Sequence, residues 1–449
     1  MKKRRPVVIA ISLATIACML AGCAKNGGSA NTTTNTNDSE KTAITIMQSK
    51  TEANDGYKKA IAAYEKMHPG VTITLTAISG NDFSASLKAQ MQSNPPTIFS
   101  CGSFQDLKDY GNMMADLSDM SILKYADKGT TDMFTKDGKV YAVPLYMEGY
   151  GFVINRQIFT DAGVSFDSML TFDGMKKGFD TLKAKISSGA MKAKYPNLQA
   201  VMEYSTKELW IAGDHDANVA LTHDFSTATQ AYNAKTLPGT GFAGYKTMVD
   251  FQAGFTANAN DTAKLNSIDY TSEVENGLAT ERVAAIKQGD WVAPAVEAVD
   301  PNVLNKLDML PYSVPGYSDG KYFTGVSGYW AINSKASEKQ IKAAKDFIDW
   351  LYEDKEGQKI VVQDCKFIPP YDNFEGIKAS DPLSQRLMDA ISKGNTLNGF
   401  VYSGAPSTWS QQVVGVEVQK YLAGKETWDN VTKNSIAQWA ELRQQQQGQ

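Results

Sequence analysis

The alternation of apolar and polar positions predicts strands and helices from residue 42 onward. Residues 42–47 and 71–75 are expected to be strands, the second with a period of two, and residues 97–101 form an apolar run typical of a buried parallel strand. Between them, 57–67 and 83–92 have helical patterns, with Tyr57, Ala60, Ile61 and Tyr64 on one face of the first. This order predicts an α/β domain with a parallel sheet.

Two later segments extend this pattern. Residues 140–155 form a long extended stretch in which Pro144 cannot donate a ladder hydrogen bond, so we expect a break or a crossover between sheets there. Residues 327–333 are also extended and precede a helix expected at 338–351. Ser337 and Gln340 have the spacing of a capping box at the start of this helix, and its apolar face contains Ile341, Phe347 and Leu351.

The two ends of the chain have a different composition. Four basic residues at 2–5 precede an apolar run at 7–21, which is shorter than the ~20 residues of a membrane span and predicts a secretory signal at 1–22. The sequence Leu-Ala-Gly-Cys at 20–23 resembles the bacterial lipobox, so Cys23 is expected to carry lipid and to anchor the protein at the extracellular face of the cytoplasmic membrane. Residues 23–41 are expected to be a flexible tether and 444–449 a polar tail.

The remaining residues, about 400 in number, are sufficient for two sizeable domains. Loss of the signal removes four positive charges and no acids, which changes the formal net charge from −4 to −8 and argues against nucleic acid as a partner. Cys101 and Cys365 are far apart in sequence, and we expect them to be buried or unpaired thiols. Core burial rather than disulfides should therefore hold the fold.

Polar loops follow two of the predicted parallel strands. Ligands of such sheets bind beyond the carboxyl ends of the strands, which directs attention to the loops 48–52 and 102–105. These loops contain Gln48, Lys50, Glu52 and Ser103, which are candidates for a binding site but could equally be solvated loop residues.

Patterns typical of enzymes and cofactor sites have weaker support. Residues 316–320 match G-x-S-x-G, but Pro315 precedes them and a strand-like segment follows, so a turn is expected. His215 and His223, with their acidic neighbours, are interpreted as polar loop residues rather than metal ligands, and no nucleotide-binding glycine pattern occurs. We therefore expect no cofactor and no metal.

Several segments together resemble the extracellular solute-binding lipoproteins of bacterial ABC sugar importers, the maltose-binding-protein-like group, over nearly the whole mature length. They are Tyr-Ala-Val-Pro at 141–144, Phe-Val-Ile-Asn-Arg at 152–156, Ala-Ala-Ile-Lys-Gln-Gly-Asp-Trp at 284–291, Gly-Tyr-Trp-Ala-Ile at 328–332, Ala-Ala-Lys-Asp-Phe at 343–347 and Tyr-Leu-Ala-Gly-Lys at 421–425. The chain departs from maltose-binding protein at 101–103, where it has Cys-Gly-Ser, and this argues against the same specificity for maltose.

The resemblance implies a two-lobe, Venus-flytrap α/β fold that closes over a sugar. Lobe one would comprise 42–144 and 324–368, lobe two 145–323 and 369–443, with hinge crossings near Pro144, Phe323 and Pro369. The predicted ligand contacts include two aromatic residues of the hinge segments, Tyr146 and Tyr329. The other ten are Gln48, Lys50, Glu52, Ser103, Glu148, Glu203, Trp210, Asp290, Trp291 and Trp409. The implied partners are an oligosaccharide and the permease subunits of an ABC transporter, with the protein itself a monomer.

The residues themselves suit a sugar. A pyranose presents an apolar face to an aromatic ring and hydroxyls to carboxylates, amides and basic groups. Trp291 and Trp409 lie among loop residues and are favoured for the site, whereas Trp350 and Trp439 lie on helical patterns and are assigned to the core. The sequence thus predicts a binding protein that catalyses nothing. The alternatives are a surface glycosidase using two of Glu148, Glu203 and Asp290, or a binding protein for a non-sugar solute.

Overall fold

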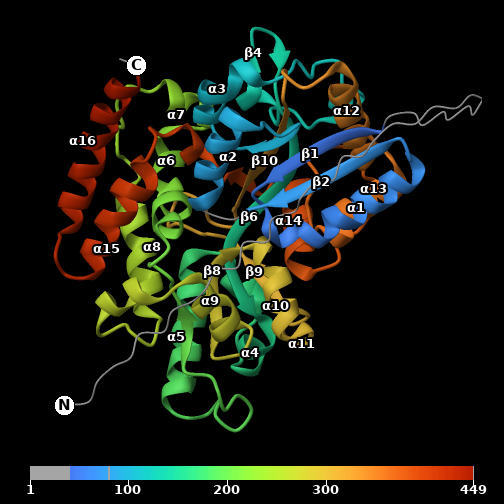
Figure 1. Ribbon diagram of the computed structural model, residues 1–449. Helices are drawn as coiled ribbons and strands as arrows, with labels where there is room; N and C mark the ends of the chain where they lie inside the picture. The colour runs from blue at the N-terminus through green and yellow to red at the C-terminus, as the bar shows by residue number, and fades with distance from the viewer. Residues whose placement is uncertain (1–40, 79–80, 448–449) are drawn as a thin grey trace, which may run out of the picture. The chain divides into compact units, whose positions relative to one another are not determined.

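The computed structural model describes residues 41–78 and 81–447, so the predicted signal, Cys23 and all of the tether but Lys41 lie outside the described residues. Eleven strands occur in this part of the chain (Figure 1). They are β1 (Thr42–Gln48), β2 (Val71–Ala77), β3 (Ile98–Cys101), β4 (Thr135–Lys136), β5 (Lys139–Val140), β6 (Val143–Asn155), β7 (Ala200–Glu203), β8 (Val283–Gly289), β9 (Leu307–Leu310), β10 (Tyr322–Ile332) and β11 (Thr396–Asn398).

Nine of these strands form one sheet. Its order is β2-β1-β3-β10-β6-β8-β7, with β11 paired to β10 and β9 paired to β6. The strand β1 pairs in parallel with β2, from Thr42 opposite Val71 to Gln48 opposite Ala77, and in parallel with β3. The predicted parallel opening of the chain is therefore confirmed.

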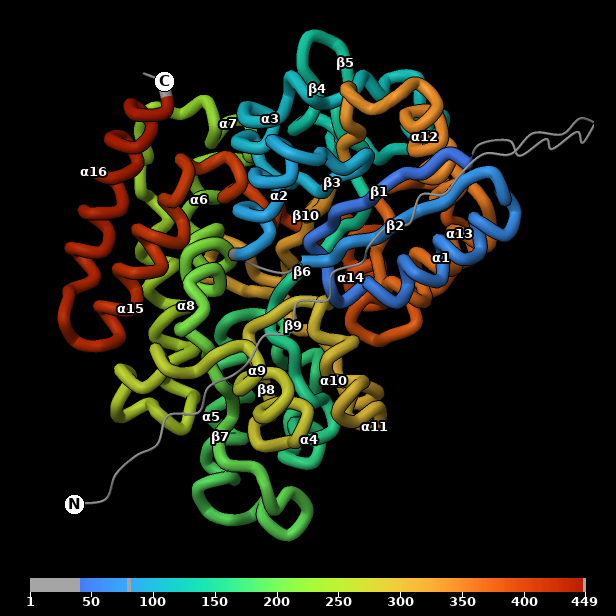
Figure 2. Tube along the Cα trace, in the orientation of Figure 1, coloured from blue at the N-terminus to red at the C-terminus, as the bar shows by residue number. Residues whose placement is uncertain are grey.

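The long strands β6 and β10 join the two ends of this sheet, as their central position in Figure 2 illustrates. The first half of β6 pairs with β10, and its second half pairs with β8 and β9. Pro144 is the second residue of β6, so the break expected at this residue does not occur. A proline is tolerated there because the missing N–H falls at the start of the strand.

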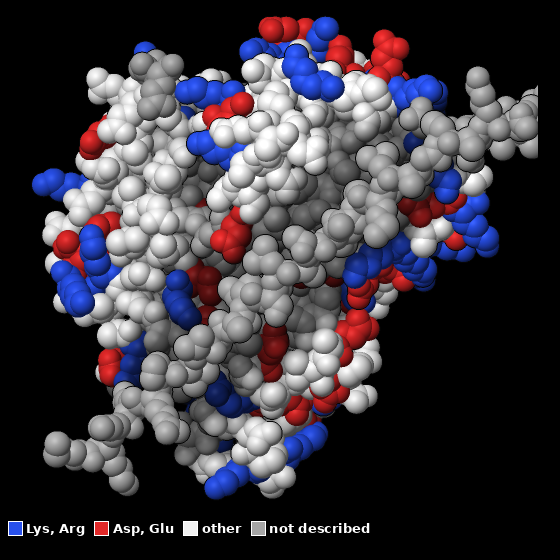
Figure 3. Space-filling model, in the orientation of Figure 1, with Lys and Arg blue, Asp and Glu red and all other residues white. Residues whose placement is uncertain are grey.

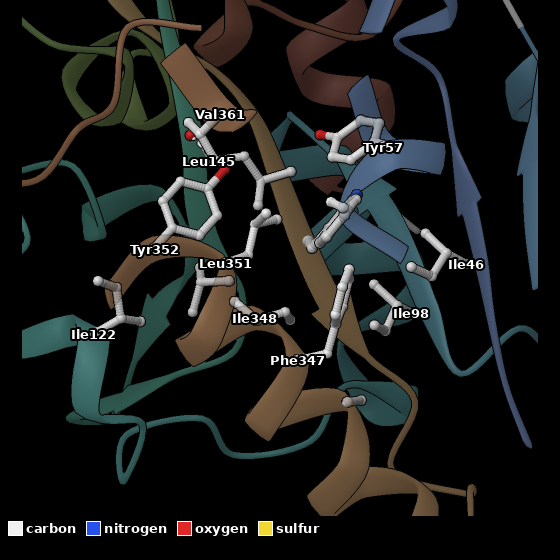
Figure 4. Close-up of a cluster of buried hydrophobic side chains, with 14 of the residues drawn as sticks. Ile46, Tyr57, Ile98, Ile122, Leu145, Phe347, Ile348, Leu351, Tyr352 and Val361 are labelled. Atoms are coloured by element: carbon white, nitrogen blue, oxygen red, sulfur yellow. Dashed lines mark hydrogen bonds between the residues drawn. The ribbon is translucent and has the colours of Figure 1, made fainter. Parts of the chain in front are cut away.

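One group of helices packs with β1, β2 and β3, and we call this part of the molecule lobe one. Its helices are α1 (Asn54–Met67), α2 (Asn81–Ser93), α3 (Phe104–Tyr110), α12 (Glu338–Glu353) and α13 (Lys355–Lys359). The predicted faces of α1 and α12 meet in a core that includes Ile46, Tyr57, Phe347 and Leu351 (Figure 4). The capping box predicted for α12 is present, since Ser337 and Gln340 each bond the other's backbone.

The other helices pack on β7, β8, β9 and the second half of β6 or on helical segments beyond these strands, and we call this part lobe two. They are α4 (Arg156–Asp161), α5 (Phe172–Ser187), α6 (Asn218–Asp224), α7 (Ala228–Asn233), α8 (Phe242–Gly254), α9 (Tyr270–Glu273), α10 (Ala293–Val299), α11 (Pro301–Leu304), α14 (Pro382–Ser392), α15 (Val416–Leu422) and α16 (Trp428–Gln447). Three apolar clusters fill this lobe. Trp439 is fully buried in one of them, and Trp350 packs against the core of lobe one, as predicted for both.

The connection between β10 and α14 returns the chain from lobe one to lobe two. Tyr371 and Phe374 pack in the core of lobe one, although they follow the boundary at 368/369 that the resemblance implies, whereas Leu383 packs in lobe two. The chain therefore leaves the core of lobe one between Phe374 and Leu383.

The end of the described chain is helical where a polar tail was expected. Helix α16 continues through residues 444–447, because glutamine is a good helix former and the last turns are held by side-chain contacts. Arg443 donates to Gln446 Oε1 at 3.0 Å, and Lys108 Nζ donates to the Gln446 carbonyl at 3.1 Å. Four residues of the predicted polar tail therefore belong to α16.

Cys101 and Cys365 are both buried and free, as expected from the sequence. On the face drawn in Figure 3, basic and acidic side chains are interspersed among wide uncharged areas. Among the helices of the described residues, none combines the length and the apolar character that a membrane crossing requires.

Candidate functional site

A cavity of about 480 Å³ lies where the loop after β1, the middle of β6 and β10, and segments of lobe two meet. This volume falls within the ~300–1,000 Å³ of small-molecule sites. Its polar lining includes Lys50, Glu52, Glu148, Glu208, His215 and Ser327, and its aromatic lining is Trp210, Tyr270, Trp291, Phe400 and Tyr402. We call it the central cavity.

A chain of charged and polar groups crosses the floor of the central cavity. Lys50 Nζ lies 2.5 Å from Glu148 Oε1 and 3.5 Å from Glu52 Oε1, and Ser327 Oγ donates to Glu148 Oε2 at 2.5 Å. Lys50 lies in the loop after β1, Glu148 in the middle of β6 and Ser327 in the middle of β10. Three segments far apart in sequence therefore supply one hydrogen-bonding surface.

Burial and charge act in opposite directions on Lys50. Burial lowers the pKa of its ammonium group, but the carboxylates of Glu148 and Glu52 outweigh this effect and hold the pKa well above its usual value. Lys50 is therefore a fixed positive charge at neutral pH, and its pair with Glu148 offers both donors and acceptors to a ligand.

The orientation of Trp291 is set by hydrogen bonds on the side away from the central cavity. The indole N–H of Trp291 donates to Gln288 Oε1 at 3.0 Å, and Gln288 Nε2 donates to Glu273 Oε2 at 2.6 Å. Ser205 Oγ also donates to Glu273 Oε2, at 2.6 Å. With its N–H engaged there, the partly exposed ring of Trp291 offers its carbon surface to the cavity.

His215 differs from its prediction as a polar loop residue. It is 8% exposed and belongs to a π-helical segment, Ile211–Asp216, where it stacks on Tyr150 with ring centroids 4.7 Å apart. Burial lowers its pKa well below the usual value, and the nearby Lys287 and Lys50 lower it further, so the imidazole is neutral. Its Nδ1 atom is buried and has no hydrogen-bond partner among the described residues.

Five of the twelve predicted ligand residues line the central cavity. They are Lys50, Glu52, Glu148, Trp210 and Trp291.

Three more predicted residues lie directly behind this lining. Gln48 Oε1 accepts from the backbone N–H of Lys50 at 2.5 Å, and the Tyr146 ring lies 5.8 Å from Lys50 Nζ. Asp290 is buried and accepts from the Gly149 N–H at 3.0 Å.

The other four predicted residues lie elsewhere. Trp409 is fully buried in lobe two, where its N–H donates to the Ser435 carbonyl, so the expectation that it lines the site was wrong. Glu203 is buried beside Arg282 at 3.2 Å, and Tyr329 packs against Phe134. Ser103 caps α3 and lines a neighbouring cavity.

Six cavity residues were not predicted, namely Glu208, His215, Tyr270, Ser327, Phe400 and Tyr402. Ser327 could have been found, because it lies in the extended segment that was recognised at 327–333. The others come from short helical segments and connections of lobe two. No local pattern in the sequence indicates that these segments approach β1 and β6.

The G-x-S-x-G segment forms a turn, as predicted. Ser318 is fully buried, its hydroxyl donates to the Tyr312 carbonyl at 2.7 Å, and it accepts from the Val314 N–H at 2.8 Å. This hydroxyl closes the turn and is not presented to a substrate. Among the described residues, no group of three or more His, Cys, Asp or Glu side chains is placed to hold a metal ion.

Comparisons with known proteins agree with this architecture. The family model described as bacterial extracellular solute-binding protein matches residues 59–385. The melibiose/raffinose/stachyose-binding protein MelE of Bacillus subtilis is 27% identical over 350 residues, which cover 76% of this chain and 75% of that protein.

Solved structures of the same kind superpose on most of the chain. A binding protein of Bacillus subtilis in an open conformation matches with a TM-score of 0.69 and 22% identity, covering 91% of this chain and 100% of that one. A sugar transporter of Bacillus licheniformis in complex with stachyose matches with a TM-score of 0.64 and 18% identity, covering 89% of this chain and 100% of that one. The predicted two-lobe α/β fold is therefore confirmed.

Proposed function

Because the chain belongs to the bacterial extracellular solute-binding proteins, we propose that it binds an oligosaccharide in the central cavity and delivers it unchanged to the permease of an ABC importer. The contacts that we propose to hold the sugar are Lys50 and Glu148 on the floor and Trp291 on the wall. The two lobes would close around it about the hinge segments near residues 144, 323 and 369.

The observation that carries this proposal is the combination of a charged floor with aromatic walls. The Lys50–Glu148–Ser327 chain presents donors and acceptors side by side, as the hydroxyls of a sugar require. Trp210, Trp291 and Tyr402 provide carbon surfaces against which the apolar faces of sugar rings can pack. A cavity for an apolar solute would not place a buried ion pair on its floor, because desolvating those charges is costly.

The ligands named for the relatives supply the probes. Melibiose, raffinose and stachyose form a series of two, three and four sugar rings, and calorimetric titration with each would test the proposal. Binding of any of them should raise the melting temperature, since a ligand at 100 times its dissociation constant stabilises the folded state by ~2.7 kcal/mol. Parallel titration with spermidine tests the non-sugar alternative.

The same samples separate binding from hydrolysis. After incubation the sugar is recovered and analysed by chromatography, and a receptor returns it intact. Release of shorter sugars with turnover would instead support the glycosidase, in which two carboxylates act on the glycosidic bond.

The proposed attachment to the membrane rests on Cys23. In Cys23→Ser the acylation site is lost, so we expect the protein to be released into the medium or to retain its signal, and metabolic labelling with a fatty acid to disappear. Labelling that persists in the variant would contradict a lipid at Cys23, while leaving sugar binding by the mature protein unaffected.

A further inference from the structure

A second cavity, of about 230 Å³, adjoins the central cavity. Tyr402 is the residue common to both linings, so the two spaces border the same side chain. One wall of the second cavity comes from lobe one, where Phe104 begins α3, and the other comes from the segment 402–411 of lobe two together with Asp214 and Tyr232.

Asp214 gives the second cavity a carboxylate. The residue is 8% exposed, and it receives hydrogen bonds from Ser410 Oγ at 2.5 Å and from Gln411 Nε2 at 2.7 Å. Each of its oxygens accepts one of these bonds and has capacity for a second. Burial raises the pKa of Asp214 to about 6 against the effect of the two hydrogen bonds, so the group is ionised at pH 7.5.

The π-helical backbone at Asp214 and His215 directs these two neighbouring side chains to different cavities. Asp214 and His215 are consecutive residues of the π-helical segment Ile211–Asp216, and they line the second and the central cavity respectively. This segment packs closely on a second π-helical segment, Trp409–Gly415: a Cβ atom on Gly213 would lie 2.1 Å from the Ser410 carbonyl oxygen. Such π-helical turns occur frequently at functional sites.

The second cavity also has an aromatic surface. Phe104 of lobe one stacks on Tyr232 of lobe two, with ring centroids 4.5 Å apart and an angle of 17° between the rings. Hydroxyls of Ser403 and Ser410 and the amide of Gln411 also line the space. Carboxylates, a hydroxyl and aromatic rings also line the central cavity, so the second cavity repeats the kinds of group that we propose to hold the sugar there and adds the Gln411 amide.

We propose that the second cavity is a further sugar subsite, in which Asp214 accepts hydrogen bonds from hydroxyls of a ring that only oligosaccharides of three or more rings place there. The inference rests on the proposed function, because the first rings of the ligand occupy the central cavity. It makes Asp214 and Phe104 determinants of ligand length.

The test compares ligand lengths on one set of variants at pH 7.5. Calorimetric titration of Asp214→Asn with stachyose and with melibiose should show an affinity lower by about tenfold or more for stachyose and changed less than twofold for melibiose, because the charged acceptor is lost only for the longer sugar. Trp291→Ala should weaken binding of both sugars. Asp180→Asn, an exposed carboxylate on α5, is the matched control and should behave as the parent with both.

Other outcomes overturn the inference. Equal losses of affinity for stachyose and melibiose in Asp214→Asn would show that Asp214 acts on the central cavity. An unchanged affinity for stachyose would show that the additional rings of this sugar lie elsewhere. If Asp214→Asn does not fold, Phe104→Ala on the opposite, partly exposed wall must show the same dependence on ligand length, or the subsite is refuted. A parent protein that binds none of these sugars contradicts the proposed function itself, whereas binding without length dependence contradicts the subsite alone.

Discussion

Trp291 and Trp350 are both partly buried tryptophans, but they contact different things. Trp291 faces the central cavity, whereas Trp350 packs on Tyr64 and Phe347 with ring centroids 5.3 Å and 6.3 Å away. Trp291→Ala should lower sugar affinity roughly thirtyfold or more, as removal of a buried aromatic anchor costs about 2 kcal/mol or more. Calorimetric titration measures this loss.

Trp350→Ala provides the contrast. It should destabilise the fold by somewhat less than the about 3–5 kcal/mol of a fully buried tryptophan, while the folded protein binds sugar as the parent does. Thermal melts and titrations on both variants distinguish the two roles. A Trp291→Ala protein that melts early but binds normally would place this residue in the core and the site elsewhere.

Glu273, which accepts a hydrogen bond from the Gln288 side chain behind Trp291, makes the stability of the fold depend on pH. Burial raises the pKa of the Glu273 carboxyl to about 8, although Ser205 and Gln288 donate hydrogen bonds to it. In the unfolded chain a glutamate has a pKa of ~4.3. Between that pH and about 8, the native protein therefore holds a proton that the unfolded chain lacks. The stability contributed by this carboxyl is therefore complete below the unfolded pKa and is lost as the pH rises toward 8.

We expect the free energy of unfolding of the parent to fall between about pH 6.5 and 8, by up to ~1.4 kcal/mol per pH unit from Glu273. Glu273→Gln cannot ionise, so its denaturation midpoint should vary less over this range. This pH range lies above the pKa of Asp214, which burial raises to about 6, so Asp214 contributes little to the change. Glu441→Gln, on the exposed side of α16, should keep the parent's dependence, and an equally steep Glu273→Gln profile would mean that another group titrates.

At the residue scale, the sequence distinguished side chains near a strand end better than it distinguished tryptophans. Lys50 was found because it follows a recognisable strand, whereas Glu148 came from the family resemblance and Trp291 from that resemblance and its loop-like neighbours. Trp409 has loop-like neighbours in the sequence but is fully buried, because two π-helical segments pack there. Whether a loop tryptophan faces solvent depends on contacts across hundreds of residues, and these have no local pattern.

Helix α12 shows how far one element can be derived from its own residues. Ser337 Oγ accepts from the Gln340 N–H at 3.3 Å, and Gln340 Oε1 accepts from the Ser337 N–H at 3.1 Å. Ser337→Ala should destabilise lobe one by about 0.5–2 kcal/mol, because a first-turn N–H loses its partner. Chemical denaturation measures this change.

Two controls make the Ser337 prediction specific. Ser337→Asn retains a capping oxygen and should restore most of the lost stability. Sugar affinity should be the same in all three proteins, since this cap lies outside the central cavity. A Ser337→Ala protein as stable as the parent would show that water satisfies the freed N–H at no cost.

Elements with a regular period were predictable and irregular ones were not. The strands β1, β2 and β3 and the helices α1, α2 and α12 have apolar residues at the spacing of their secondary structure. A π-helical turn adds one residue to a helix, which shifts the apolar period and removes the signal on which such predictions depend. His215 lies in such a turn, and its role as a cavity residue was missed for that reason.

At the scale of the whole molecule, the two lobes share a sheet whose ladder is irregular in the middle of β10. In the pairing of β10 with β6, the register shifts twice, between Val326 and Gly328 and between Gly328 and Tyr329. Such bulges disrupt the ladder and permit bending. Gly328 also allows a close approach, since a Cβ there would lie 2.4 Å from the Tyr146 ring. The family resemblance placed a hinge in these strands, but periodicity alone showed only two extended segments.

We expect sugar binding to close the two lobes by bending β6 and β10 near these bulges. Closure is favoured because the Lys50–Glu148 pair and the aromatic wall of lobe two contact the same ligand, so a closed state makes contacts that a separated one lacks. Small-angle scattering should therefore give a smaller radius of gyration with raffinose than without it. Trp291→Ala at the same sugar concentration should remain uncompacted, because its affinity is lower, and should compact once the sugar is raised to saturation. Tight binding by the parent with an unchanged radius would mean that the sugar enters a cavity that is already formed, and the hinge would then have no part in recognition.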